Sequence, residues 1–283
     1  MTPDEASLKD STVPVRDAAR AWAPDYYITA LLAPADVRDD LVTLAAFWGD
    51  TGRVALTVGE DMLGEIRLQW WRDALSTGAS SSGHPVADAM RALIAKRRLD
   101  VAIVDGLLDA RCAELRRLPF ESEASFDRYL ASTDGALVGL AASIRGLDVT
   151  GPGNALLTTA ARALGRVRIA LDLPYLASRS RLPLWPGALG YDYDPQDAAG
   201  RSAEGAQAVH ELVQGARAAL INVREAAQGV DRRLIDAMLP IALLEPYLRA
   251  LETKGRDPLR DVAAISPLSR VARLTWAHVR GRI

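Results

Sequence analysis

Nearly every periodic segment of this 283-residue chain repeats its apolar side chains with the spacing of a helix. Between residues 62 and 75, for example, Leu63, Ile66, Trp70 and Leu75 recur at steps of three to five residues, with charged residues between them. Period-two runs of β-branched residues, which would indicate strands, are absent from the sequence. The pattern therefore predicts an all-α fold.

Prolines and glycines divide this pattern into separate helices. The spacing predicts helices at residues 25–33, 36–57, 59–77, 84–97, 100–117, 123–145, 153–178, 202–227, 231–251 and 266–280. The longest break, residues 179–200, holds three prolines, three glycines and three aromatic residues. It is either a functional loop or a surface crossover held down by Trp185 and Tyr191. With no internal repeat and no linker, we expect a loose tail at residues 1–20 and one helical domain at 21–283.

Composition excludes several classes of protein. A net charge of −2 leaves no basic excess for nucleic acid, and the single Cys112 excludes an intramolecular disulfide. The three histidines are far apart in sequence and lack metal-ligand spacing. No apolar run reaches the roughly 18 residues of a membrane span, and the acidic N-terminus resembles no targeting peptide. We therefore expect a cytoplasmic protein, with peripheral contact with the inner membrane as a further expectation.

Several stretches together carry a resemblance to a known family. They are Pro24–Pro34, Leu44–Phe47, Leu63–Trp71, Tyr129–Gly139 and Ala163–Pro183. In these stretches the chain resembles the squalene/phytoene synthase family, the head-to-head prenyl synthases, and the resemblance extends over roughly residues 20 to 280. It implies an isoprenoid-synthase-like helical bundle around a central cavity.

In that family, two aspartate-rich motifs on facing helices hold the magnesium ions that neutralise a departing diphosphate. At the first motif this chain reads Gly52-Arg53-Val54-Ala55-Leu56, and Asp50 lies one turn too early. At the second, Arg168, Leu171-Asp172 and Leu176 stand where the enzymes have Asn, Arg-Asp and a later Asp. Asp50 and Asp172 are the residual metal candidates. We expect no cofactor, and magnesium only if prenyl transfer was retained.

The replacements suggest ion pairs in place of the metal. Asp50 and Arg53 are three residues apart, and Arg168 and Asp172 are four apart, so each pair shares one helix face. We hypothesise that the old metal site has become a closed ion-pair network between helices. The hypothesis fails if these four side chains point to bulk solvent.

The chain resembles most a divergent branch of the family, which includes a respiratory complex I assembly factor and its alphaproteobacterial relatives. This resemblance implies a non-catalytic protein that acts by binding in the assembly of a membrane complex. Two alternatives remain: a prenyltransferase that uses farnesyl or geranylgeranyl diphosphate, and a non-catalytic carrier of an isoprenoid or other lipid.

Each of these functions would use particular residues of the chain. If substrate binds, the resemblance places Arg38 and Tyr129 near it, and Gly135 and Gly139 either leave room for a ligand chain or allow close helix packing. A protein partner would contact a surface formed by Trp70 and Trp71, or one at the basic C-terminus. That C-terminal segment, which includes Arg273 and Trp276, either docks on the bundle or lies at an anionic membrane surface.

Overall fold

A computed structural model describes residues 3–76, 78, 81–116, 118–148, 155–189 and 201–283; side chains are described from residue 13 and, after the last gap, from 205. These residues form helices and turns without a β-strand, which confirms the all-α prediction. Within this described part, no helix combines the length and the apolarity needed to cross a bilayer.

The helices follow the chain in order. They are α1 (Pro3–Trp22), α2 (Pro24–Leu31), α3 (Ala35–Thr57), α4 (Asp61–Leu75), α5 (Pro85–Arg97), α6 (Val101–Ala113), α7 (Glu123–Leu130), the π-helical turn η1 (Ala131–Gly135), α8 (Ala136–Ile144), α9 (Ala155–Ala177), α10 (Pro186–Leu189), α11 (Arg201–Ala226), α12 (Arg232–Ala237), the 3₁₀ turn η2 (Leu239–Leu243), α13 (Leu244–Leu251) and α14 (Pro267–Arg280).

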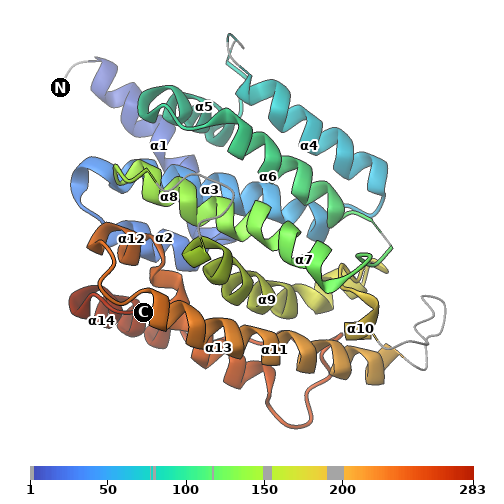
Figure 1. Cartoon of the computed structure of the whole chain (residues 1–283). Coiled ribbons are helices and arrows are strands. Elements are labelled where there is room, and N and C mark those ends of the chain that lie inside the picture. The colour runs from blue at the N-terminus through green and yellow to red at the C-terminus, as the bar shows by residue number, and fades with distance from the viewer. Residues whose placement is uncertain (1–2, 77, 79–80, 117, 149–154, 190–200) are drawn as a thin grey trace.

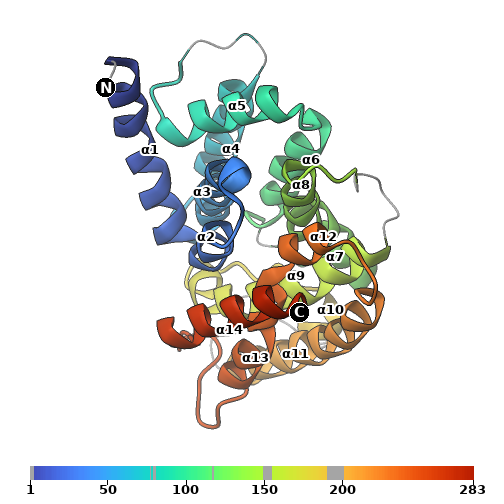
Figure 2. The ribbon, with the colours of Figure 1, turned by 90° about the vertical axis from the view of Figure 1, so that its left-hand side faces the viewer.

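The bundle has two apolar cores that meet at α8 (Figures 1 and 2). The first core joins α1 to α6 around α3, and the second joins α7 and α9 to α14 around α9 and α11. Alternate faces of α8 serve the two cores: Leu137 and Leu140 belong to the first, and Val138 and Ala142 to the second. Side chains three to four residues apart on one helix allow this division.

The N-terminus differs from the expected loose tail. Residues Pro3–Trp22 form α1, which packs along α3. Its apolar contacts include Val15 and Ala19, which are 5% and 0% exposed. Sequence patterning missed this helix because Pro14 interrupts it and half of its residues are polar or charged.

Two predicted helices are interrupted in the structure. The predicted helix 123–145 contains the π turn η1, and the predicted helix 231–251 divides into α12, η2 and α13. The second break occurs at Pro240, whose ring has no amide hydrogen to donate to the helix.

The proline-rich segment 179–200 begins as a buried connection. Arg181 is fully buried and donates hydrogen bonds to the backbone oxygens of Leu115, Ala55 and Val58, so it joins three segments of the chain. Trp185 is also buried, with its ring centroid 5.0 Å from that of Phe126. The predicted anchor Tyr191 and residues 190–200 lie outside the described residues.

Candidate functional site

A cavity of about 690 Å³ lies between the two halves of the bundle. Its wall is formed by α3, α9, α13, the end of α1 and the segment that leads into α14. Apolar side chains such as Leu56, Leu164 and Leu171 line it. Its charged lining residues are Asp25, Arg53, Arg111, Asp134, Arg168, Asp172, Arg179 and Arg270. Arginines therefore outnumber carboxylates on this wall.

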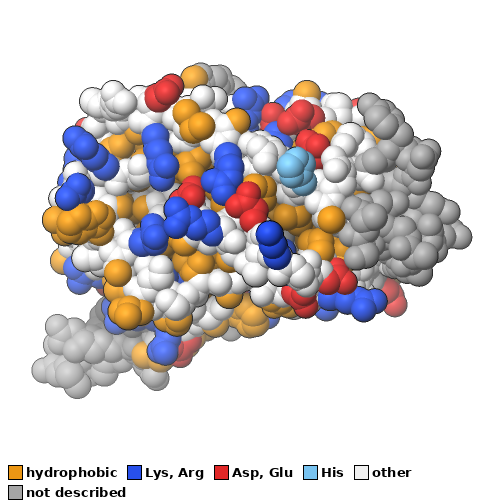
Figure 3. All heavy atoms as spheres, turned by 90° about the horizontal axis from the view of Figure 1, so that it is seen from below, with side chains coloured by type: hydrophobic (Ala, Val, Ile, Leu, Met, Phe, Trp, Pro, Cys, Tyr) orange, Lys and Arg blue, Asp and Glu red, His pale blue; other side chains and the backbone are white. Residues whose placement is uncertain are grey.

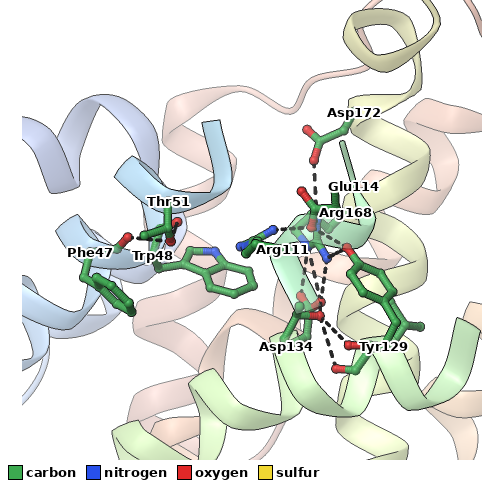
Figure 4. Close-up of polar contacts among 11 residues, drawn as sticks. Phe47, Trp48, Thr51, Arg111, Glu114, Tyr129, Asp134, Arg168 and Asp172 are labelled. Carbon is green, nitrogen blue, oxygen red and sulfur yellow. Dashed lines mark hydrogen bonds and ion pairs between the residues drawn. The ribbon is translucent and has the colours of Figure 1, made fainter. Parts of the chain in front are cut away.

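Arg168 is the centre of a buried ion-pair cluster, called here the Arg168 cluster, with Arg111, Glu114, Tyr129 and Asp134 (Figure 4). Its Nη2 donates to Asp134 Oδ2 at 2.9 Å and to the Tyr129 hydroxyl at 2.8 Å. Its Nη1 donates to Glu114 Oε1 at 3.3 Å, and Arg111 donates to the same oxygen at 2.6 Å. The Tyr129 hydroxyl also donates to Glu114. Three separate stretches of the chain, residues 111–114, 129–134 and 168, thus converge on one network.

Charge pairing offsets the burial of Glu114 and Arg168 in this cluster. Burial raises the pKa of the Glu114 carboxyl, but the guanidiniums of Arg111 and Arg168 outweigh it, and the pKa is lowered overall. The pKa of Arg168 is raised well above its usual value: burial lowers it, but Asp134, Tyr129 and Glu114 more than compensate. Each carboxylate is thus matched by a guanidinium, as buried charges require.

The π turn places Asp134 in this network. Asp134 lies within η1, between α7 and α8, and its side chain is 1% exposed. A π turn adds one residue to the helix and so rotates the following side chains relative to the preceding ones. Thr133 supports the carboxylate with a hydroxyl 3.1 Å from Asp134 Oδ2. The local bulge therefore aims an acidic side chain at Arg168.

Gly52 leaves space for Arg111 at the position of the first aspartate-rich motif. A Cβ atom at Gly52 would lie 3.1 Å from Arg111 Nη2. The Arg111 guanidinium also lies 3.8 Å from the centre of the Trp48 ring, a cation–π contact. The Arg111 guanidinium therefore lies next to Gly52, where the resemblance to the prenyl synthases implies a metal-binding carboxylate in those enzymes.

Asp50 and Arg53 form a separate pair. Arg53 Nε donates to Asp50 Oδ1 at 2.9 Å, and His84 Nε2 lies 3.9 Å from the other carboxylate oxygen. Asp50 is buried and does not line the cavity, whereas Arg53 lines it and lies over the Trp22 ring at 4.8 Å. The structure therefore does not bring Asp50 and Asp172 together on the cavity wall.

Asp172 lines the cavity at the edge of the Arg168 cluster (Figure 4). Its carboxylate lies 3.8 Å from Arg168 Nη1. Burial raises the pKa of Asp172 to about 7; Arg168 opposes this shift, and Glu114 adds to it. None of the four side chains in the ion-pair hypothesis points to bulk solvent, since each is at most 25% exposed. They belong to two networks rather than one, and Arg168 bonds mainly to Asp134, Glu114 and Tyr129.

These residues do not fit a magnesium–diphosphate centre. Magnesium needs ionised carboxylate oxygens with free lone pairs. Asp134 and Glu114 are held by arginines, burial raises the pKa of Asp172 to about 7, and Asp50 does not line the cavity. Across the described residues, no three Asp, Glu, His or Cys side chains converge to form a metal site.

The predicted substrate residues lie away from the cavity wall. Arg38 donates both its Nε and Nη2 to the carbonyl oxygen of Ala33, and Tyr129 is buried inside the Arg168 cluster. Gly135 and Gly139 face α9: added Cβ atoms would meet Ala161 Cβ at 3.2 Å and Leu157 Cδ1 at 3.7 Å. The contact at Gly135 is that of close helix packing, one of the two roles considered, whereas the distance at Gly139 is that of an ordinary van der Waals contact.

The predicted partner residues separate into core and surface. Trp71 is 2% exposed and packs edge-on against Phe47, so its assignment to a surface is wrong. Trp70, one residue earlier, is 37% exposed, because neighbouring residues on a helix point in different directions. Arg273 and Trp276 on α14 are exposed.

Sequence reasoning missed Arg111, Glu114 and Asp134. The first two lie three residues apart near the end of a predicted helix, and Asp134 lies inside the recognised 129–139 segment. The available signal for Asp134 was its position as an acidic residue among apolar and small residues. Nothing local indicates that all three meet Arg168.

Comparisons with known proteins agree with this fold. The family model described as squalene/phytoene synthase matches residues 19–277. Assembly factor 6 of NADH dehydrogenase (ubiquinone) complex I from Mus musculus is 23% identical over 237 residues, which cover 82% of this chain and 71% of that protein. These matches confirm the resemblance to the family and to its assembly-factor branch.

Two solved structures share the fold. Squalene synthase HpnC from Alicyclobacillus acidocaldarius has a TM-score of 0.63 at 17% identity and covers 99% of this chain and 97% of that one. A dehydrosqualene synthase with bound ligand has a TM-score of 0.69 at 11% identity, with 97% and 98% covered. With the family model matched over nearly the whole chain, this protein belongs to the squalene/phytoene synthase family.

Proposed function

We propose that this chain is a non-catalytic member of its family that acts by binding in the assembly of a respiratory, complex I-like membrane complex. The observation that carries the proposal is the Arg168 cluster. It pairs Asp134 and Glu114 with arginines on the cavity wall, where a diphosphate–magnesium group would need free carboxylates. The similarity to complex I assembly factor 6 supports the assembly role.

Electrostatics supports the loss of catalysis. A magnesium ion at this wall would lie among Arg53, Arg111 and Arg168, whose charges repel a divalent cation. Displacing the arginines from their carboxylates would leave buried charges unpaired, which costs about 3–5 kcal/mol for each broken pair. Metal binding would therefore have to overcome the stabilisation of the cluster.

A lipid carrier is the second candidate, and the cavity favours it. The apolar lining and the volume of about 690 Å³ suit a hydrocarbon chain, and Arg179 lies on the wall without a carboxylate partner among its described contacts. A carrier would retain lipid through purification. Organic extraction of the purified chain followed by mass spectrometry tests this reading, and a cavity free of lipid would contradict it.

The first experiment measures pyrophosphate release from farnesyl or geranylgeranyl diphosphate in the presence of magnesium. An intact phytoene synthase is the positive control, and circular dichroism verifies that the chain is folded. We expect no release. Release that is lost when Asp172→Ala is introduced would overturn the non-catalytic proposal.

The second experiment tests assembly directly. The gene is deleted in its own organism, and NADH:ubiquinone oxidoreductase activity is measured in membranes together with the subcomplexes resolved on native gels. We expect lower activity and accumulated subcomplexes, both restored by the wild-type chain. Normal activity and a normal gel pattern after deletion would contradict the assembly role.

A further inference from the structure

The C-terminal helix α14 has one apolar face toward the bundle and another toward solvent. Leu274 and Ala277 are buried against the rest of the chain. Leu268, Val271, Trp276 and Val279 are exposed, three of them by more than 60%. Steps of three to five residues place these four on one side of the helix. They are called here the outer stripe of α14.

Polar contacts hold α14 in this orientation at both ends. Near its start, Arg270 Nε lies 2.5 Å from Asp25 Oδ1, and Arg270 Nη2 donates to the Tyr247 hydroxyl at 3.0 Å. Near its end, His278 Nδ1 lies 2.9 Å from Asp236 Oδ1. The helix therefore cannot turn its outer stripe inward without breaking contacts at both ends.

Positive charge borders the outer stripe. Arg273, Arg280 and Arg282 are exposed, and residues 267–283 contain no aspartate or glutamate. The Arg280 guanidinium lies 4.2 Å from the centre of the Trp276 ring. Figure 3 shows basic side chains beside hydrophobic ones at the left-hand end of the molecule, where Figure 1 places α14. The basic border is local, since the whole chain carries a net charge of −2.

The segment that leads into α14 lines the mouth of the cavity. Trp22, Tyr175 and Val262 line the cavity and are also about half exposed, so they mark its opening. Val262 lies in the segment that leads into α14, and the Arg270–Asp25 contact joins α14 to the chain three residues beyond Trp22. The exposed apolar residues Val262, at the mouth, and Leu268, at the start of the outer stripe, thus lie six residues apart in the chain.

We propose that α14 lies on the surface of a bilayer that contains anionic phospholipid, with the cavity mouth facing that surface. Apolar side chains bordered by arginines, with acids absent, match an apolar layer covered by phosphates. Helix α4 provides a contrast, because its apolar side chains Met62, Leu63 and Ile66 are also exposed by more than half. Asp61, Glu65 and Asp73 lie on that same helix, so it has no such preference for negative charge. The inference does not depend on the assembly role.

Vesicle flotation of the full chain tests the docking surface. We expect binding to phosphatidylcholine vesicles that contain phosphatidylglycerol and much weaker binding to phosphatidylcholine alone. Arg273→Gln with Arg280→Gln should weaken binding about thirtyfold, at roughly 1 kcal/mol per arginine. Trp276→Ala with Val279→Ala should weaken it at least about tenfold through lost apolar burial.

Matched controls use residues away from α14. Met62→Ala with Ile66→Ala removes equally exposed apolar groups, and Arg67→Gln with Arg249→Gln removes two charges; both pairs should bind vesicles like the wild type. Thermal melting of every variant verifies folding. Absence of wild-type binding, or equal binding by the α14 variants and the wild type, overturns the proposal. Loss of a protein complex in these variants without vesicle binding would assign the stripe to a protein partner instead.

The orientation of the mouth needs its own measurement. In a Cys112→Ser background, an environment-sensitive fluorophore is attached at Val262→Cys near the mouth or at Ile66→Cys on α4; both positions are exposed by more than half. On addition of anionic vesicles, the emission at position 262 should shift to the blue, and that at position 66 should not. A shift at 66 alone, or at neither position, would refute the orientation.

Discussion

Replacing Asp172 by Asn is expected to raise the free energy of unfolding at about pH 8 and to change it little near pH 4. Burial raises the pKa of the Asp172 carboxyl to about 7 in the folded chain, against an ordinary 3.8. The folded chain thus holds this proton more tightly than the unfolded chain does. Stability linked to Asp172 is therefore fully present below about pH 4 and is lost as the pH rises through about 7.

The two pKa values differ by about 3, which corresponds to about 4 kcal/mol. A quarter of the Asp172 side chain is exposed, and water there screens part of the effect. We therefore expect a gain of about 2–4 kcal/mol for Asp172→Asn at about pH 8. Asn has the shape of a protonated carboxyl, so the packing beside Arg168 is retained.

Urea unfolding followed by circular dichroism at about pH 4.5, 6 and 8 measures the effect. The difference between Asp172→Asn and the wild type should grow with pH and level off above about pH 7. Asp105→Asn is the matched control, because that residue is exposed on α6. A difference in free energy of unfolding that does not depend on pH would refute the reasoning about burial. So would a wild type that is more stable than Asp172→Asn at pH 8.

Three further predictions test the packing of the bundle by the same unfolding measurement, and the first two compare neighbouring positions. Trp71→Ala should lower the free energy of unfolding by about 3–5 kcal/mol, whereas Trp70→Ala should cost much less, and equal losses would contradict the core assignment. Gly135→Ala should destabilise by about 1–3 kcal/mol, because its Cβ meets a rigid methyl group at 3.2 Å; Gly139→Ala, with 3.7 Å of space, should be neutral or stabilising. Arg181→Met should cost about 3 kcal/mol or more by leaving three backbone oxygens without their donor, and a change under about 1 kcal/mol would show that water replaces it.

Local information in the sequence was enough for most of the helices. Their apolar spacing depends on side chains three or four residues apart, which lie on one face whatever the rest of the chain does. The all-α class and the Asp50–Arg53 pair follow from that spacing. Helix α1 was missed because Pro14 interrupts its pattern, and the breaks at η1 and Pro240 lie inside segments whose apolar spacing continues.

The resemblance in sequence located the helix positions of both degraded motifs, but it did not show what replaced the metal. Arg168 meets Glu114, 54 residues away, and Asp134, 34 residues away, and a π turn aims Asp134 at it. The resemblance also did not show that Trp71 is buried while Trp70 is exposed. Long-range pairing and burial depend on how several helices pack at once. The amino-acid sequence therefore specified which charged side chains need partners, because a buried charge is stable only beside an opposite charge. The packing of α6, η1 and α9 determined which side chains those partners are.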